Sequence, residues 1–320
     1  MTATPTAEIA AQLPVCSICG GQLELARQGS ASGHEPSAFS PSCHRTGEHG
    51  DFYRCRRCGT LHQPSLPRGS ALYDIYRAVS DERYMVEERG RRRTARRLLD
   101  RLGKYVPEGR LLQVGCGYGL LLDEARRRGY AVEGVEPSIE AAGYAREQLG
   151  LPVRPLALEE ADLRGERYDA ILLVDVLEHL GDPRAALDRL PELLVPAGVL
   201  VIVTPDPSSL TARLAGANWW CYVPAHSCLI PRETLRQLLV VRDLDIVEDV
   251  ASVHSFTPGY WLAGLGERGG WVGRAITQVA ARLPRSLLLT ASLRDERVLL
   301  ARNLQTTGQH ARRWQPGNCA

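Results

Sequence analysis

Short apolar runs alternate with helical patterns along most of this chain from residue 111 onward. Each apolar run is followed by a segment of about 10 to 15 residues in which apolar positions recur every three or four residues. Strands that alternate with helices of this length are typical of βαβ units. We therefore predict an α/β fold with a doubly wound, mostly parallel, seven-stranded sheet. The expected strands are 111–115, 131–136, 153–156, 169–174, 199–204, 244–250 and 297–302, and the expected helices are 120–128, 138–149, 183–194 and 232–241.

The remaining segments have a different texture. Residues 1–69 are rich in Ser, Gly, Pro, His and Cys, and we expect them to form a small separate module. Residues 70–108 are dense in charge, with leucines spaced as on one helix face, which predicts a helical linker. The expected parts that follow are a large domain over 109–304, with an irregular insert at 205–230 and a partly helical excursion at 258–283, and a loose tail over 305–320.

Composition narrows the class of protein. The chain has 320 residues, of which 44% are hydrophobic and 24% are charged, with a net charge of +2. This balance does not suggest a protein that wraps a polyanion. We find no apolar run of about 18 residues and no signal-peptide pattern, so we expect a cytoplasmic protein without a membrane span. Nine cysteines in a reducing compartment suggest metal ligands or free thiols before disulfides.

Two copies of the pattern CxxCG stand in the N-terminal segment, with cysteines at Cys16, Cys19, Cys55 and Cys58. Two such turns can place four thiolates at the corners of a tetrahedron, which suits a structural Zn²⁺ site of the zinc-ribbon kind. Iron in the same site, metal-free thiols and a redox pair are the alternatives. Other residues that could supply a ligand are His34, Cys43, His44 and His49.

A glycine-rich turn joins the first expected strand of the large domain to its helix. Glycines at 115, 117 and 119 allow close approach of a ligand, and the helix N-terminus offers free N–H groups. A dinucleotide fingerprint would need glycine at position 120, where Leu120 stands, which disfavours a nicotinamide-dependent oxidoreductase. Glu136 ends the second strand, where an acid can accept hydrogen bonds from both hydroxyls of a ribose.

Four motifs of the large domain carry a family resemblance: VGCGYG at 114–119, GVEPS at 134–138, YDAILLVDVLEHLGDP at 168–183 and PAGVLVIVTP at 196–205. With these motifs the chain resembles class I S-adenosylmethionine-dependent methyltransferases, in the group with VLEH and TP signatures. The N-terminal module is similar to the zinc-binding part of some of these enzymes, including certain sugar methyltransferases. The resemblance implies a Rossmann-like methyltransferase fold and S-adenosylmethionine as methyl donor.

The resemblance also implies a set of cofactor-binding residues. Glycines of the loop would line the methionine and ribose parts, Glu136 would hold the ribose, and Asp175 would face the methionine end or the acceptor. Such families usually carry an acid two residues before the first glycine, where this chain has Gln113, whose amide oxygen can still accept from the ammonium group. The implied cofactor residues are Gln113, Gly115, Cys116, Gly117, Gly119, Glu136, Pro137, Leu158, Glu159 and Asp175.

The insert offers candidates for the acceptor side. The segment 218–226 contains Trp219, Trp220, Tyr222 and His226, and we interpret it as the acceptor wall. Histidine is the common general base near neutral pH, so His226 is the first catalytic candidate, although it could instead only pin the loop. The other candidates are Asp175 and Tyr222 as catalytic partners, and Asp206, His179 and His254 with weaker claims.

We predict methyl transfer to a small-molecule or saccharide acceptor, most readily at oxygen. An RNA or protein methyltransferase that grips its substrate with the module is the alternative, and a fold retained only for binding is another. The arginine-rich stretch 89–97 would suit RNA, but a solvated helix face explains it more simply. Nucleic acid is therefore not the expected partner, and the sequence sets no oligomeric state.

Overall fold

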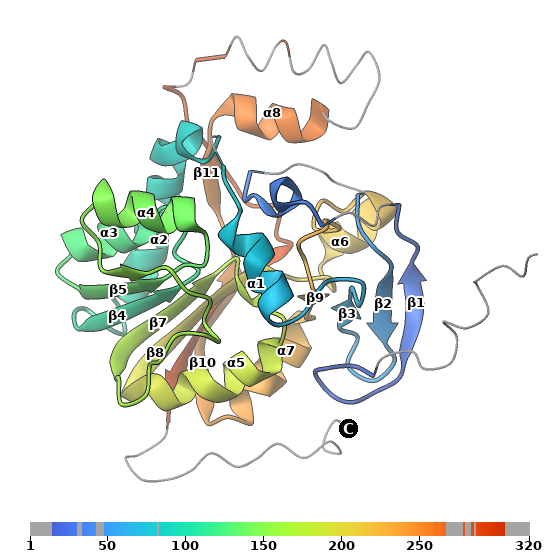
Figure 1. The fold of residues 1–320 in the computed structure, drawn as a ribbon, viewed down its shortest axis with the longest axis horizontal. Helices are drawn as coiled ribbons and strands as arrows, with labels where there is room; N and C mark the ends of the chain where they lie inside the picture. The colour runs from blue at the N-terminus through green and yellow to red at the C-terminus, as the bar shows by residue number, and fades with distance from the viewer. Residues whose placement is uncertain are drawn as a thin grey trace, which may run out of the picture.

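A seven-stranded sheet forms the centre of the computed structural model, which describes residues 15–30, 34–42, 48–81, 83–266, 278, 283–284 and 286–304. The strand order is β10-β13-β8-β7-β4-β5-β6, and only β13 runs against its neighbours (Figure 1). This arrangement confirms the predicted doubly wound, mostly parallel sheet. The strands are β4 (Arg110–Val114), β5 (Ala131–Val135), β6 (Val153–Arg154), β7 (Tyr168–Val174), β8 (Leu194–Pro205), β10 (Leu244–Ala251) and β13 (Glu296–Asn303).

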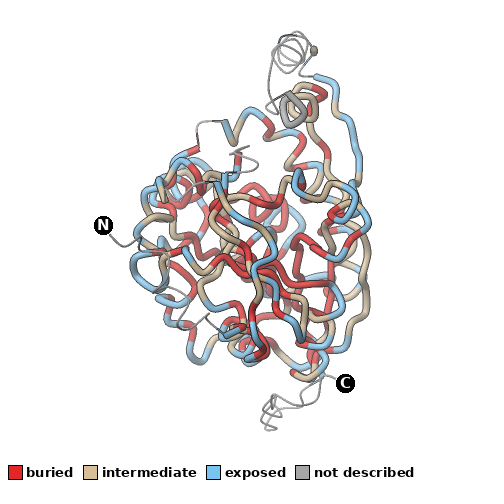
Figure 2. The backbone as a smooth tube through the Cα atoms, turned by 90° about the vertical axis from the view of Figure 1, so that its right-hand side faces the viewer, coloured by how far each residue is buried: buried red, intermediate tan, exposed pale blue. Residues whose placement is uncertain are grey.

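Helices cover both faces of this sheet. Because both faces are covered, the central strands are apolar at nearly every position, and their side chains alternate between two cores. Ala170 and Leu172 of β7 pack with one helix layer, whereas Ile171 and Leu173 pack with the other. In Figure 2 the buried residues, drawn in red, run through the centre of the molecule. The first layer is α2 (Glu88–Leu102), α3 (Leu120–Arg127) and α4 (Ile139–Glu147), and the second is α5 (Pro183–Arg189) and α7 (Arg232–Val240).

The helix expected at 183–194 is shorter than predicted. It ends at Arg189, and the 3-10 turn Leu190–Leu193 follows with Pro191 in its first turn. Proline has no backbone N–H to continue the helix, which explains the break. β8 then begins at Leu194, earlier than expected.

The N-terminal segment forms a second, four-stranded antiparallel sheet with the order β1-β2-β3-β9. β1 (Leu23–Arg27), β2 (Phe52–Cys55) and β3 (Leu61–His62) come from this segment, but β9 (Cys228–Leu229) comes from the insert. The insert, expected to be irregular, is so over most of its length, but it contributes β9 and also α6 (Leu210–Ala215). The division at residue 69 stays a prediction, and a strand from the large domain completes the sheet of the module.

Segments around the carboxyl ends of the large sheet complete the fold. α1 (Ser70–Arg77) lies in front of these strand ends in Figure 1, so the predicted linker does more than connect. β11 (His254–Phe256) pairs with β12 (Leu289–Ala291), and α8 (Pro258–Gly266) begins the expected helical excursion. No helix among the described residues is long and apolar enough to cross a membrane. The predicted tail over 305–320 lies outside the described residues.

Candidate functional site

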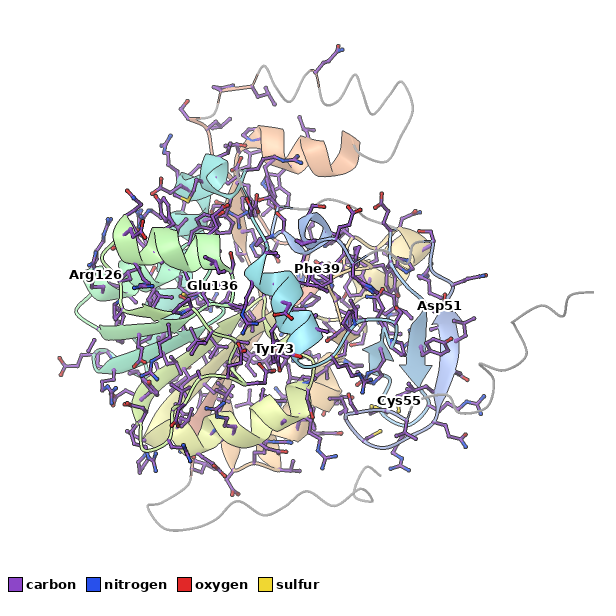
Figure 3. The ribbon with its side chains drawn as sticks, in the orientation of Figure 1. Phe39, Asp51, Cys55, Tyr73, Arg126 and Glu136 are labelled. Atoms are coloured by element: carbon purple, nitrogen blue, oxygen red, sulfur yellow. The ribbon has the colours of Figure 1, made fainter. Side chains whose placement is uncertain are left out.

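A cavity of about 1170 Å³ lies at the carboxyl ends of the parallel strands. In doubly wound folds, ligands bind at this edge, because the loops that follow the strands meet there. Glu136 at the end of β5, Tyr73 of α1 and Phe39 of the N-terminal module, all labelled in Figure 3, line it. The cavity therefore connects the large domain with the module, and its volume can take two ligands of moderate size.

The glycine loop forms one wall of this cavity. Gly115 and Gly117 have φ of 63° and 53°, a region that favours glycine. A Cβ atom on Gly115 would lie 2.5 Å from a methyl carbon of Val176, so no side chain fits there. Gly119 does not line the cavity; a Cβ atom there would lie 2.7 Å from Leu151, so this glycine serves helix packing. Cys116 lies between Gly115 and Gly117, and all three line the cavity.

Glu136 is held in place by the glycine loop itself. Its Oε2 atom accepts a hydrogen bond from Gly117 N at 2.7 Å, and its Oε1 atom accepts one from Ser138 N at 2.8 Å. Burial raises the pKa of Glu136 above its usual value. Since a carboxylate oxygen has two lone pairs, each oxygen keeps one acceptor position. Two free acceptors on one fixed carboxylate match the two hydroxyls of a ribose.

Gln113 lines the same cavity and is buried, yet its Oε1 atom has no hydrogen-bond partner among the described residues. A buried acceptor without a partner is unfavourable, so this atom is suited to receive a donor from a ligand. The ammonium group of a methionine moiety is such a donor. Pro137, Leu158 and Glu159 also line the cavity, and burial raises the pKa of Glu159.

The sequence analysis missed a cation in this wall. The Arg91 guanidinium stacks on Tyr84, with its carbon 3.8 Å from the ring centroid, and lines the cavity. None of the described carboxylates forms an ion pair with Arg91, so it can receive an anion from a ligand. The interpretation of 89–97 as a solvated face is wrong for Arg92 as well, which is 9% exposed and pairs with Asp123. A charge run alone does not show which of its arginines point inward.

Acidic side chains gather opposite the glycine loop. Asp175, with φ of 54°, follows β7, and its pKa is raised well above the usual value, first by burial and then by the charge of Glu296. Burial raises the pKa of Glu178 to about 8, and the Thr204 hydroxyl donates to this carboxyl at 3.0 Å. Asp175, Glu178 and Glu296 all line the cavity.

Two histidines stand beside these acids. His226 Nδ1 lies 2.7 Å from Cys221 O, and His179 Nδ1 lies 2.9 Å from the Tyr76 hydroxyl. The two rings are 4.8 Å apart, and both line the cavity. Burial lowers the pKa of His226 to about 4 and that of His179 to about 3, so both rings are neutral at neutral pH. Each ring keeps its Nε2 atom for a ligand or a proton.

The cavity also offers a candidate cation site and a third histidine. Ligand atoms of Glu178, His179 and His226 lie within 4.8 Å of one another, which suits a divalent cation. His254 Nε2 instead bonds the Glu296 carboxylate and lies 3.1 Å from the Ser252 hydroxyl. Burial alone would lower the pKa of His254, but Glu296 outweighs it and raises that pKa. His254 is therefore the more basic imidazole in the cavity.

Several acceptor-side candidates do not reach the cavity. Tyr222 packs on Phe52 and His49 with ring centroids 5.2 and 5.6 Å away, and it does not line the cavity. Trp219 is buried, with its Nε1 atom donating to Asp295 at 2.8 Å. Asp206 accepts hydrogen bonds from backbone N–H groups, including that of Arg232 at 3.1 Å. The candidates in segment 218–226 that do line the cavity are Trp220 and His226.

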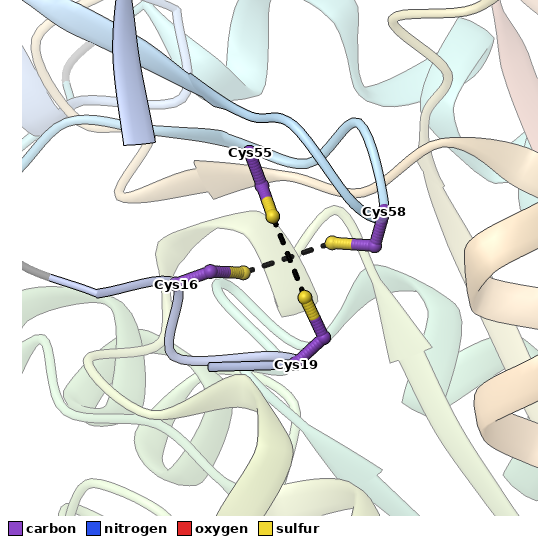
Figure 4. Close-up of side chains that lie close together, drawn as sticks. All are labelled: Cys16, Cys19, Cys55 and Cys58. Atoms are coloured by element: carbon purple, nitrogen blue, oxygen red, sulfur yellow. Dashed lines mark hydrogen bonds between the residues drawn. The ribbon is translucent and has the colours of Figure 1, made fainter. Parts of the chain in front are cut away.

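The four cysteines of the CxxCG turns converge on one centre (Figure 4). The Sγ atoms of Cys16 and Cys58 lie 3.6 Å apart, and those of Cys19 and Cys55 lie 3.4 Å apart. A tetrahedral zinc with bonds of about 2.3 Å requires about 3.8 Å between sulfurs, close to this spacing. The residues present therefore fit a tetrathiolate metal.

The structure does not bring the alternative ligand His49 to the four cysteines. His49 lies in the aromatic cluster with Phe52 and Tyr222, and its Nδ1 atom lies 2.7 Å from Gly50 O. Cys43 and His44 lie outside the described residues. A histidine that the sequence analysis did not single out stands beside the cluster instead, with His62 Nε2 3.2 Å from Cys16 Sγ. An N–H that donates to a thiolate supports a metal ligand from outside.

Comparisons with known proteins show the family of this chain. The family described as Methyltransferase domain matches residues 87–249. The ubiquinone biosynthesis O-methyltransferase of Cereibacter sphaeroides is 35% identical over 171 residues, covering 50% of this chain and 68% of the relative. The enzyme of that name from Rhodopseudomonas palustris is 37% identical over 117 residues, covering 34% and 46%. The solved N-methyltransferase NodS from Bradyrhizobium japonicum, in complex with S-adenosyl-L-homocysteine, is 16% identical, with a TM-score of 0.48 over 73% of this chain and 97% of NodS.

Proposed function

Since this chain belongs to the methyltransferase domain family and is an S-adenosylmethionine-dependent methyltransferase, we propose that it methylates a hydroxyl group of a small molecule. The observation that carries the proposal is one cavity lined both by Glu136 and by His226. A cofactor held at Glu136 and an acceptor held at His226 would share this space without a barrier between them. The two relatives named above are O-methyltransferases by name, which agrees with transfer to oxygen.

We assign the cofactor end to the wall around the glycine loop. Glu136 would receive the ribose hydroxyls, Gln113 Oε1 the ammonium group and Arg91 the carboxylate of the methionine moiety. When bound, the cofactor supplies an electrophilic methyl group on a charged sulfur. The protein must then align the acceptor and remove its proton. The other residues assigned to this end are Gly115, Cys116, Gly117, Pro137, Leu158 and Glu159, with Asp175 between cofactor and acceptor.

We assign proton removal to His226. Its Nδ1–H can donate to Cys221 O at 2.7 Å, which leaves the Nε2 lone pair for the hydroxyl proton of the acceptor. Acceptors that fit are small and partly apolar, because Phe39, Leu72, Val223 and Trp220 line this end. A cavity with these apolar side chains at its acceptor end does not favour RNA or protein as acceptor. The four cysteines are assigned to a structural Zn²⁺, since four thiolates leave no open position for chemistry.

The experiment measures S-adenosyl-L-homocysteine formation by the full chain with a panel of phenols, catechols and saccharides. We expect turnover with a hydroxylated small molecule. His226→Gln should lower kcat by about a hundredfold or more and leave the affinity for S-adenosyl-L-homocysteine unchanged. His254→Gln is the matched variant in the same cavity, and a larger loss there would transfer the role of base to His254.

A chelation test separates a histidine base from a bound cation. We expect turnover of the zinc-loaded chain to need no added Mg²⁺ and to survive a chelator too weak to remove zinc from four thiolates. Loss of turnover that Mg²⁺ restores would instead indicate a cation at Glu178, His179 and His226, because thiolates do not bind Mg²⁺. Absence of any affinity for S-adenosylmethionine or its demethylated product would contradict the whole proposal.

A further inference from the structure

Gln63 connects the N-terminal module to the loop that carries His226. It follows β3 and is 3% exposed. Its Nε2 atom donates to Pro224 O at 2.9 Å and to His226 O at 3.0 Å. Its backbone N–H donates to Ser227 O at 2.9 Å. One residue of the module therefore bonds three backbone carbonyl groups of this loop, which we call the acceptor loop (residues 221–227).

The oxygen of the Gln63 amide fixes the orientation of the amide. Its Oε1 atom accepts a hydrogen bond from Gly50 N, so the amide cannot turn over without losing this bond. A reversed amide would also place its oxygen against the carbonyl oxygens of Pro224 and His226. Because all of these groups are buried or half-buried, unpaired partners would be costly. The contact is therefore specific for glutamine in this orientation.

The opposite side of the acceptor loop is tied to the segment after β7. Ser227 N donates to Glu178 O at 2.8 Å, and the Ser227 hydroxyl donates to Leu180 O at 2.6 Å. The Nδ1 atom of His226 is then oriented by Cys221 O. Gln63 and Ser227 thus hold the backbone around His226 from two sides. The imidazole direction depends on both.

The strand that directly precedes Gln63, β3, is bonded to the cysteine site. His62 Nε2 contacts Cys16 Sγ at 3.2 Å, and Cys58 Sγ contacts the Thr60 hydroxyl at 3.2 Å. Cys55 N also donates to Thr60 O at 2.9 Å. In the register of β3 and β9, His62 lies opposite Cys228, directly after the acceptor loop. A metal that orders these thiolates would therefore also order β3 and Gln63.

We propose that Gln63 is a positioning residue through which the four-cysteine site holds His226 at the acceptor end of the cavity. The effect on catalysis rests on the proposed function. The ordering of the acceptor loop by the cysteine site through Gln63 does not. The module is then part of the acceptor site, and its metal acts on catalysis through β3 and one amide group. This role differs from gripping a macromolecular substrate.

The test compares Gln63→Glu with Gln22→Glu in the full, zinc-loaded chain. The first substitution keeps the shape but places a carboxylate against two carbonyl oxygens, and the second makes the same charge change at an exposed position of the same module. Hydrogen–deuterium exchange is measured on peptides from the acceptor loop and from the glycine loop. We expect exchange in the acceptor loop to rise about tenfold or more in Gln63→Glu only, with the glycine loop unchanged.

A pH profile separates positioning from a general loss of structure. The introduced carboxyl faces carbonyl oxygens, which raises its pKa, and its protonated form can again donate one hydrogen bond. The excess exchange of Gln63→Glu over the unsubstituted chain should therefore shrink between about pH 8 and about pH 6. Gln63→Leu cannot donate at any pH, so its excess exchange over the unsubstituted chain should not depend on pH. This variant also tests the role of Gln63 if Gln63→Glu does not fold.

Removal of the metal tests the link to the cysteines. We expect chelation to speed exchange in the acceptor loop of the unsubstituted chain and to add little in Gln63→Leu, since both changes break the same path. With an accepted substrate, kcat should fall at least tenfold in Gln63→Leu while the KM for S-adenosylmethionine stays within about twofold.

Each contrary result has its own meaning. Unchanged exchange in folded Gln63→Leu would overturn the role of Gln63. Unchanged exchange after metal removal would overturn the link to the cysteine site. Failure of the unsubstituted chain to bind S-adenosyl-L-homocysteine would contradict the proposed function alone, because the exchange measurements need no ligand.

Discussion

Glu136→Gln removes a charge from the centre of the assigned ribose site and keeps the shape of the side chain. In the structure each carboxylate oxygen accepts one backbone N–H, from Gly117 and from Ser138, and keeps one acceptor position. An amide has only one oxygen, so one ribose hydroxyl would lose a charge-assisted hydrogen bond worth about 1.5–3 kcal/mol. Since about 1.4 kcal/mol corresponds to a factor of ten, we expect Kd to rise about 10- to 100-fold.

The same substitution should also lower stability. The introduced NH₂ group must face one of the two backbone N–H groups, which leaves a buried donor unpaired at a cost of about 1–3 kcal/mol. Urea unfolding measures this loss, and titration calorimetry with S-adenosyl-L-homocysteine at about pH 8 measures the affinity. Glu147→Gln, at an exposed position of α4, is the control and should change neither quantity.

The pH dependence of the affinity for S-adenosyl-L-homocysteine is a second test of the role of Glu136. Burial raises its pKa, so the charged form that binds hydroxyls best is lost as pH falls through that raised value. Affinity of the unsubstituted chain should therefore decline toward acid pH, and that of Glu136→Gln should not. An affinity of Glu136→Gln within about twofold of the unsubstituted chain at about pH 8 would refute this assignment of the ribose site.

Three further predictions concern other parts of the molecule. Metal analysis of freshly purified protein should find one zinc per chain, and Cys58→Ser should lose most of it and unfold at lower urea; absence of stoichiometric metal would remove the assignment. Gln113→Glu should tighten S-adenosyl-L-homocysteine binding about fivefold in calorimetry at about pH 8, because a charged acceptor binds ammonium more strongly; weaker binding would contradict the role of Gln113. Burial lowers the pKa of His226 from 6.5 to about 4, so the folded state takes up fewer protons than the unfolded state between these values and stability falls as pH falls. His226→Asn should reduce this slope by up to about 1.4 kcal/mol per pH unit in urea unfolding, and an unchanged slope would show that the ring is charged when folded.

The large sheet was predictable because its signal is local. Strands covered on both faces are apolar at nearly every position, as in β7, and each is separated from the next by a helix of regular pattern. The convergence of the glycine loop and Glu136 followed from the same topology, since the carboxyl ends of adjacent parallel strands must meet at one edge. The four-cysteine site was equally predictable, because each CxxCG turn by itself brings two thiols together.

The features that were missed depend on contacts between distant segments. β9 has two residues, and its pairing with β3 depends on residues more than 160 positions away in the chain. Tyr222 looked like a catalytic partner of His226, but aromatic neighbours from the module hold it away from the cavity. Arg91 and Arg92 belong to one charged run, and only the packing of α2 directs one to the cavity and the other to Asp123.

The contrast between features set by local sequence and features set by distant contacts also concerns which residues determine acceptor specificity. The end of the cavity that we assign to the cofactor is lined by the glycine loop, Glu136 and the segment after β7, all within the part that matches the family. Phe39 and α1 precede the matched residues 87–249, whereas Phe256 follows them, and all three line the cavity. Chains that share the donor motifs can therefore take different acceptors without any change in those motifs. In this chain the acceptor end is completed by a module whose cysteines lie outside the cavity, so exchanging the module should change the acceptor and spare the cofactor.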